Sequence, residues 1–143
     1  MEKHTFIRDV ANGLGCDASR AEGVTSVVLQ ELRDRLTPKE AADVAAQLPA
    51  ALRRIWQEGE LPDRRVARTH RAEFIGNVRR RAALADEAEA ERAVRAVFAT
   101  LQRVLGSPTG AEGEAWDVFS QLPKDMKRLW LTAQEPVVAS TRR

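Results

Sequence analysis

The sequence is short of the residues that build covalent or metal cross-links. Its 143 residues include one cysteine, Cys16, and two histidines. One cysteine can form no internal disulfide and cannot supply a structural zinc site, which fits a reducing cytoplasm. No stretch approaches the roughly 18–20 apolar residues of a membrane span, and no charged-then-apolar leader opens the chain. We therefore expect a cytoplasmic protein with no membrane partner.

Motifs for catalysis and cofactor binding are also missing. The chain has no glycine-rich phosphate loop, nucleophile elbow or HExxH pattern. His4 stands alone, and His70 with Glu73 gives two potential ligands, which are too few for a metal site. We expect no catalytic residue, no metal and no cofactor, and hence a protein that is not an enzyme.

What the sequence does have is a helical pattern of apolar residues. Hydrophobic residues make up 43% of the chain and charged residues 31%, which is a globular composition. Apolar residues recur at steps of three and four, as an amphipathic helix requires; one such series is Val24, Val27, Val28, Leu32 and Leu36. No window alternates with a period of two, so we predict an all-α fold without a sheet.

An internal repeat is the clearest feature of the sequence. When residues 43–56 are aligned with residues 117–130, seven of fourteen positions are identical, whereas roughly one match would be expected by chance. The identical pairs are Asp43/Asp117, Val44/Val118, Gln47/Gln121, Leu48/Leu122, Pro49/Pro123, Arg54/Arg128 and Trp56/Trp130.

The repeat also extends upstream with a drifting offset. Phe6-Ile7-x-x-Val10 corresponds to Phe74-Ile75-x-x-Val78, and insertions that fall between periodic segments are what loops tolerate. We predict a tandem duplication of a roughly four-helix unit, packed as one compact bundle with pseudo-two-fold symmetry. The expected parts are repeat 1 (1–58), a linker (59–71), repeat 2 (72–132) and a flexible tail (133–143), with a longer, mobile loop at 106–113.

Helix boundaries follow from capping residues. Asp17 or Ser19 is expected to cap the second helix, Asp86 with Glu89 offers a cap in the second copy, and Thr37 precedes a proline at the first helical position. Pro49 has no amide hydrogen and disfavours a helical residue before it, so the third helix should end at Leu48 and Pro49 should open the fourth.

The repeated Gln-Leu-Pro and Trp positions have two interpretations. They could form a recognition signature, but a structural role is favoured: leucine is buried, proline sets the kink, and glutamine bonds backbone groups at the helix break. Core packing is likewise the favoured interpretation of the tryptophans. These positions are Gln47, Leu48, Pro49, Trp56, Gln121, Leu122, Pro123 and Trp130.

Positive charge is concentrated in one central stretch. Net charge is only +2, yet residues 61–85 carry seven arginines against Asp63 and Glu73. Planar guanidinium groups suit phosphate contacts, although no aromatic residues interleave with them as a single-strand binder requires. The candidate nucleic-acid or anion contacts are Arg64, Arg65, Arg68, Arg71, Arg79, Arg80 and Arg81.

The repeat resembles a family of uncharacterised bacterial proteins known only as a domain of unknown function. The resemblance is carried by Phe6 to Trp56 and Phe74 to Trp130, above all by the AAQLP segment at residues 45–49; the second copy departs from it with Phe119-Ser120. It implies an all-helical fold and a bacterial source, and it supplies no activity.

Two hypotheses of function follow. The leading one is a non-enzymatic helical protein that acts through protein–protein contacts, including self-association, in a regulatory or stress-associated role. The alternative is a nucleic-acid-binding module that uses the arginine-rich segment 64–81. A small-molecule binder between the two halves is a third possibility that needs a pocket.

Overall fold

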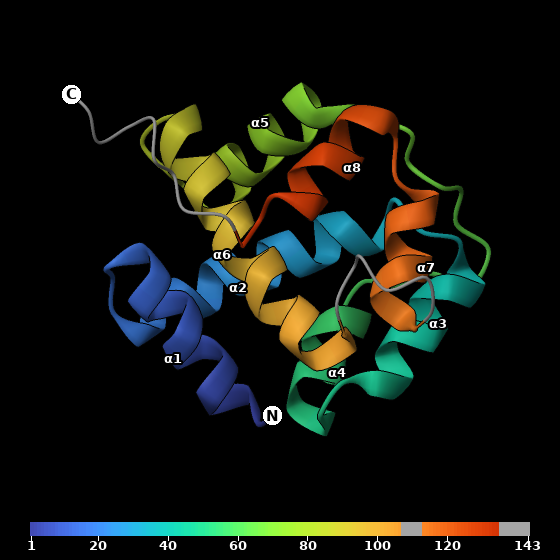
Figure 1. Cartoon of the computed structure of the whole chain (residues 1–143), viewed down its shortest axis with the longest axis horizontal. Helices are drawn as coiled ribbons and strands as arrows, with labels where there is room; N and C mark the ends of the chain where they lie inside the picture. The colour runs from blue at the N-terminus through green and yellow to red at the C-terminus, as the bar shows by residue number, and fades with distance from the viewer. Residues whose placement is uncertain (107–112, 135–143) are drawn as a thin grey trace.

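The chain folds into α-helices, as the periodicity predicts. The computed structural model describes residues 1–106 and 113–134, and this part contains eight helices and no strand (Figure 1). The bounds are α1 Lys3–Leu14, α2 Ala18–Arg33, α3 Pro38–Gln47, α4 Ala50–Gln57, α5 Arg71–Arg81, α6 Glu87–Leu105, α7 Glu114–Gln121 and α8 Lys124–Leu131. Most of the loop and the tail for which the sequence predicts mobility lies outside the described residues.

Capping residues set the helix starts. Asp17 accepts a hydrogen bond from the amide of Arg20 at 2.8 Å, Asp86 accepts one from Glu89 at 2.8 Å, and Thr37 accepts one from Glu40 at 3.1 Å. Each bond satisfies an amide that the first turn of a helix leaves without a partner. The cap of α2 is therefore Asp17, and Ser19 lies inside the helix.

Prolines shape the breaks between α3 and α4 and between α7 and α8. Leu48 and Leu122 are extended, with ψ of 144° and 148°, and each precedes a proline. Pro49 and Pro123 have nearly the same geometry, with ψ of 153° and 157°. Both prolines are N-caps, because ψ near 155° is extended rather than helical. The fourth helix therefore begins at Ala50, one residue later than predicted.

The two long helices, α2 and α6, cross in the middle of the molecule and the shorter helices surround them (Figure 1). α1 packs against both long helices, as does α5, while α4 packs on α2 and α8 on α6. The first half of the chain (1–58) therefore contacts the second half (72–132) through several helices. One buried hydrophobic cluster joins both halves, so they share a single core.

Aromatic rings form the centre of this core. Phe98 lies 5.9 Å from Phe74 and 4.9 Å from Trp130 between ring centroids, the second pair edge to face. Phe6 and Trp56 are also buried. Burial of rings of this size supplies much of the hydrophobic stabilisation in a chain that has few aromatics.

Positions that the sequence repeat pairs make matching contacts in the two halves. Arg33 on α2 donates to the carbonyl oxygen of Trp56 at 2.9 Å, and Gln102 on α6 donates to that of Trp130 at 2.8 Å. Arg33 and Gln102 are 69 positions apart, close to the offset of 68 that relates Phe6 to Phe74. Both halves therefore tie the end of their last helix to their long helix.

Among the described residues, no helix is both long enough and apolar enough to cross a membrane. This agrees with the sequence, in which charged residues interrupt every apolar stretch.

The two tryptophans differ in one hydrogen bond, which yields a matched test. Trp56 Nε1 donates to the carbonyl of Ala41 at 2.9 Å, whereas Trp130 Nε1 has no acceptor among the described residues. Both Trp→Phe changes remove a similar buried volume, so we expect W56F to lower the free energy of unfolding by about 1 kcal/mol more than W130F. Urea unfolding followed by circular dichroism measures both, and equal losses would contradict the assignment.

Candidate functional site

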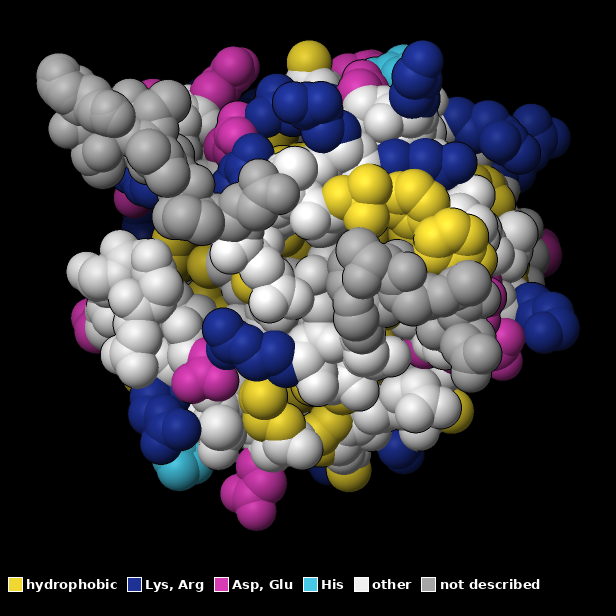
Figure 2. Space-filling view, in the orientation of Figure 1, with side chains coloured by type: hydrophobic (Ala, Val, Ile, Leu, Met, Phe, Trp, Pro, Cys, Tyr) yellow, Lys and Arg dark blue, Asp and Glu magenta, His cyan; other side chains and the backbone are white. Residues whose placement is uncertain are grey.

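The arginine-rich segment is partly built into the fold. Arg65 and Arg68 are exposed and Arg79 is half-buried. On the face shown in Figure 2, Lys and Arg side chains gather along the upper edge, over α5 and α8, and acidic side chains interrupt them. The other four predicted arginines bond to the chain itself: Arg64 to α2, Arg71 to Glu91, Arg80 to Asn77 and Arg81 to Glu31.

Arg64 has the most internal contacts of these four. Its guanidinium donates to the carbonyl oxygens of Leu36 at 2.7 Å, Arg33 at 2.8 Å and Asp34 at 3.3 Å, and it pairs with Glu60. These carbonyls stand at and just beyond the C-terminal end of α2, where the helix supplies no further amides; the amides of Leu36 and Ala67 reach those of Arg33 and Asp34. Arg64 thus caps α2 from the linker.

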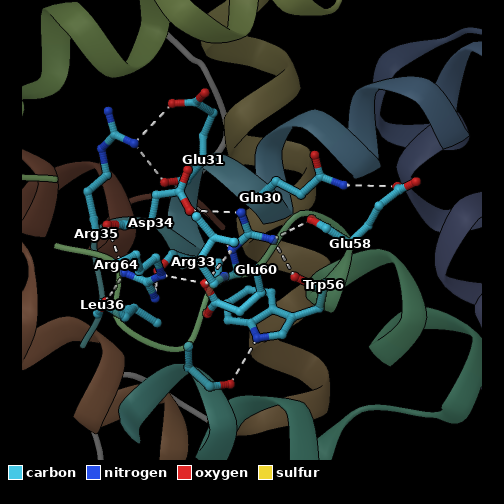
Figure 3. A network of polar contacts seen from close by, with 12 residues as sticks. Gln30, Glu31, Arg33, Asp34, Arg35, Leu36, Trp56, Glu58, Glu60 and Arg64 are labelled. Atoms are coloured by element: carbon cyan, nitrogen blue, oxygen red, sulfur yellow. Dashed lines mark hydrogen bonds and ion pairs between the residues drawn. The ribbon is translucent and has the colours of Figure 1, made fainter. Parts of the chain in front are cut away.

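Arg33 continues this network on the other side of the same helix end (Figure 3). Its side chain is 6% exposed and donates to the carbonyls of Trp56 at 2.9 Å and Glu58 at 2.7 Å, and to the carboxylate of Asp34. The buried charge is thereby surrounded by acceptors, as a buried charge requires. These contacts hold α4 and the start of the linker on α2.

The Gln-Leu-Pro positions are split between buried and exposed roles. Leu48 and Leu122 are buried, and Gln47 is exposed. The helix break after α3 is satisfied by Arg53, which donates to the carbonyls of Ala45 and Leu48, both at 2.9 Å. Arginine therefore has the role that we expected of glutamine, because its longer fork reaches two carbonyls at once.

Gln121 instead reaches across to the other half of the chain. Its Oε1 accepts a hydrogen bond from the backbone amide of Thr37 at 2.9 Å, just before α3 begins. The bond joins the C-terminal end of α7 to the N-terminal end of α3. The same two helices carry the acidic cluster described next.

Three carboxylates converge between α3 and α7. One oxygen from each of Glu40, Asp43 and Glu114 lies within 4.8 Å of the others. Acidic residues in the first turn of a helix interact favourably with its dipole, which explains Glu40 and Glu114 one at a time. The dipole does not explain why they face each other.

Glu40 is the buried member of the cluster, with 7% of its surface exposed. Its Oε2 and the Oε2 of Glu114 have no hydrogen-bond donor among the described residues. Burial, a hydrogen bond with the facing Glu114 carboxyl, and the negative charges of Glu114, Asp117 and Asp43 together raise the pKa of Glu40 to about 9. Unless a positive charge binds beside it, Glu40 holds a proton at neutral pH.

The sequence repeat includes two members of this cluster, which lie just outside the aligned block of residues 43–56 and 117–130. Three residues upstream of the aligned block, Glu40 pairs with Glu114 at the same offset as Asp43 with Asp117. Each half thus carries Glu-x-x-Asp at the start of its third helix. The spacing puts both carboxylates on one helical face.

A groove with a volume of about 850 Å³ lies between α1, α2 and α4. Its apolar lining comes from Ile7, Ala11, Ala18, Pro49 and Ala51. Most of these side chains are small, so they leave room for larger side chains from outside. A second hollow of about 420 Å³ shares Lys3 and Ala51 with the first and extends it along α4.

Charged side chains line the rim of the groove. Lys3 on α1 and Glu22 on α2 form an ion pair of 2.9 Å across its edge, and Arg8 also borders it. An exposed pair of this kind contributes at most about 1 kcal/mol. It can therefore exchange partners at little cost.

The described residues define an all-helical protein whose two halves share one core, with an apolar groove and an acidic cluster on its surface. The chain belongs to the family described as uncharacterized conserved protein (DUF2267), which it matches over residues 3–129. The resemblance to an uncharacterised family is thus confirmed. No curated protein matches the chain.

The neighbouring residues Arg64 and Arg65 separate a structural arginine from a surface one. We expect R64A to lower the free energy of unfolding by about 2–4 kcal/mol, because three carbonyls and Glu60 lose a buried charged donor. R65A should change it by less than about 0.5 kcal/mol, as an exposed site does. Urea denaturation compares the two variants, and similar values for both would refute the capping role of Arg64.

Glu40 predicts an unusual dependence of stability on pH. Its folded pKa lies above its ordinary value, so the stability from its protonation is full below about pH 4.5 and is lost as the pH rises towards 9. The pKa values of Glu60, Glu91 and Asp125 are lowered in the folded protein. The stability that these groups contribute is therefore lost only in more acidic solution, below their ordinary pKa values.

Replacing the Glu40 carboxyl with an amide should remove the loss of stability at high pH. We expect E40Q to unfold at a higher urea concentration than the wild type at pH 9, with the difference shrinking towards pH 5, in buffers that contain EDTA. E87Q, a change at an exposed residue of α6, serves as control. A constant difference between E40Q and the wild type across this range would contradict the buried acid.

Proposed function

We propose that this chain is a non-enzymatic helical module that binds a protein partner, and that the groove between α1, α2 and α4 holds an amphipathic helix of that partner. The leading hypothesis from the sequence is a protein that acts through protein–protein contacts, and the groove is where we propose that these contacts are made. The observation that carries it is the apolar groove of about 850 Å³.

The dimensions of the groove favour a helix over a small molecule. α1 has 12 residues, so it is about 18 Å long. The second hollow prolongs the groove along α4. A helix of three to four turns fits such a length, and its apolar side chains would project towards Ala11, Ala18 and Ala51.

The chemistry of the rim also suits a protein helix. Lys3 and Arg8 offer positive charge and Glu22 offers negative charge around an apolar floor. An amphipathic helix carries charges of both signs beside its apolar stripe. The Lys3–Glu22 pair would then exchange its internal contact for contacts to the partner.

We also infer that the two halves arose by tandem duplication with pseudo-two-fold symmetry. The support comes from the matching proline breaks and from the equivalent contacts of Arg33 and Gln102. The groove involves α1 and α4 of the first half. The bacterial source, the cytoplasmic location and the regulatory or stress-associated role stay predictions from the sequence.

The alternative, nucleic-acid binding through residues 64–81, has fewer arginines available than the sequence suggested. Arg65, Arg68 and Arg79 have no ion pair among the described residues, whereas Arg64, Arg71, Arg80 and Arg81 are engaged. Retention on heparin at low salt, with affinity falling steeply as salt rises, would favour this alternative.

A charged side chain placed in the groove tests the proposal. We expect A51R to weaken binding of the partner at least tenfold, because a buried guanidinium in the apolar floor has no acceptor. A88R, on the exposed side of α6 and away from the groove, should bind like the wild type. A photo-crosslinking amino acid at residue 18 identifies the partner segment, and calorimetry with the purified partner measures affinity.

The outcomes separate the hypotheses. A crosslinked segment with an amphipathic helical pattern, bound by the wild type and A88R but not by A51R, supports the proposal. A crosslink to a second copy of this chain, with a dimer in light scattering, would assign the groove to self-association instead. Equal affinity of A51R and A88R for the purified partner would refute the groove as the binding site.

A further inference from the structure

The acidic cluster between α3 and α7 lies outside the groove and has no role in the proposed protein binding. Glu40 and Asp43 come from α3, and Glu114 is the first residue of α7. Their oxygens lie within 4.8 Å of one another. Oxygens that coordinate one Ca²⁺ at 2.3–2.6 Å are at most about 5 Å apart, so a single ion can reach all three.

We propose that Glu40, Asp43 and Glu114 bind a hard divalent cation of the size of Ca²⁺, which links α3 of the first half to α7 of the second. Carboxylate oxygens are the ligands that Ca²⁺, Mg²⁺ and Mn²⁺ prefer, and the cluster contains no nitrogen or sulfur ligand that would select zinc or copper. The spacing favours Ca²⁺ over Mg²⁺, whose bonds of about 2.0–2.1 Å require a tighter arrangement, and Mn²⁺ prefers the same carboxylate oxygens.

An independent observation points to a ligand at this place. Glu40 is more than nine-tenths buried, and its Oε2 has no donor among the described residues. A buried carboxylate without a donor or a positive charge costs several kcal/mol in other proteins, and folded chains rarely keep one unpaired. The carboxylate that carries this orphaned oxygen is the one whose oxygen lies within 4.8 Å of those of Asp43 and Glu114, where a cation would sit.

The cations found among residues 1–106 and 113–134 do not fill this role. Lys39 pairs with Asp43 at 3.2 Å, but the lysine side chain is 87% exposed. That pair lies at the outer edge of the cluster and leaves the Oε2 atoms of Glu40 and Glu114 without partners. An incoming cation can displace Lys39 at little cost, because water screens an exposed ion pair.

A shared proton is the competing explanation. One proton between Glu40 and Glu114 would pair those two oxygens, but Asp43 and nearby Asp117 would keep their negative charges. A divalent cation neutralises two charges and reaches Asp43 as well. The two explanations differ in what added cations do, since protonation alone gives no response to them.

The experiment uses the full chain, freed of metal with EDTA and then dialysed into metal-free buffer at pH 8. CaCl₂, MnCl₂ and MgCl₂ are each titrated into the wild type, E40Q, E114Q and the control E87Q. Isothermal calorimetry gives the stoichiometry and Kd, and thermal unfolding gives the shift in Tm caused by each cation. Terbium luminescence, excited through Trp116 two residues from Glu114, reports binding at this end of α7.

We expect one ion per chain in the wild type and E87Q, with Ca²⁺ or Mn²⁺ raising Tm by about 5–10 °C at a hundredfold excess over Kd. E40Q and E114Q should show a Kd at least tenfold higher and lose most of this shift. The readout is the change on adding cation, so the higher stability expected of E40Q without metal does not disturb it.

Three results would overturn the proposal: no binding of any of the cations at millimolar concentration, equal shifts in all four proteins, or binding of several weak ions per chain. If cations have no effect while E40Q alone is more stable at pH 9, the cluster is a proton-sharing pair. The groove and its partner are tested by A51R, so failure of the cation site leaves that proposal standing.

Discussion

The C-terminal end of α2 is the point on which the rest of the fold depends. A helix end leaves carbonyl groups without amide partners, and here that end lies inside the molecule. Arg64 satisfies these carbonyls from the linker, and Arg33, the last residue of α2, donates to the carbonyls of Trp56 and Glu58 at the end of α4. Their rigid forks hold several acceptors at once, which a lysine cannot do. The linker amide of Ala67 adds a bond of 2.8 Å to Asp34.

The same network reaches the second half of the chain. Arg35, which is nearly buried, pairs with Glu31 at 3.0 Å and lies 4.9 Å from the ring of Phe74 on α5. Glu31 also accepts from Arg81 at the end of α5. One stretch of α2 thus positions α4, the linker and α5. The arginine-rich join is a structural element of the protein, and only part of its charge is left for a partner.

Much of the fold could be predicted from the sequence because its determinants are local. Periodicity located the helices, and Asp86, Thr37 and the two prolines marked their limits to within a residue or so. The role of Arg64 could not be predicted in this way. Its acceptors lie some 30 residues away in sequence. The sequence of an aperiodic linker does not distinguish an arginine whose guanidinium faces water from one whose guanidinium binds a helix end.

The groove and the acidic cluster differ in how far the sequence could predict them. The groove has no sequence signature, because its small residues come from three helices and become a hollow only when those helices pack. The acidic cluster was within reach of the alignment, since Glu40 and Glu114 occupy equivalent positions of the two halves. The favourable interaction with the helix dipole is enough to explain why each carboxylate lies in the first turn of its own helix. Only the packing of α3 on α7 shows that the two carboxylates meet.

The join between the halves has one further consequence, for the way the chain could be assembled. Leu61, Pro62 and Asp63 are exposed, and Leu61 has 59% of its surface open. On either side, Glu60 and Arg64 are bound to each other and to α2. A cut within these three residues would leave both new ends anchored. We therefore expect two separate polypeptides divided at this point to keep the contacts of Glu60 and Arg64 with α2 and to complement each other.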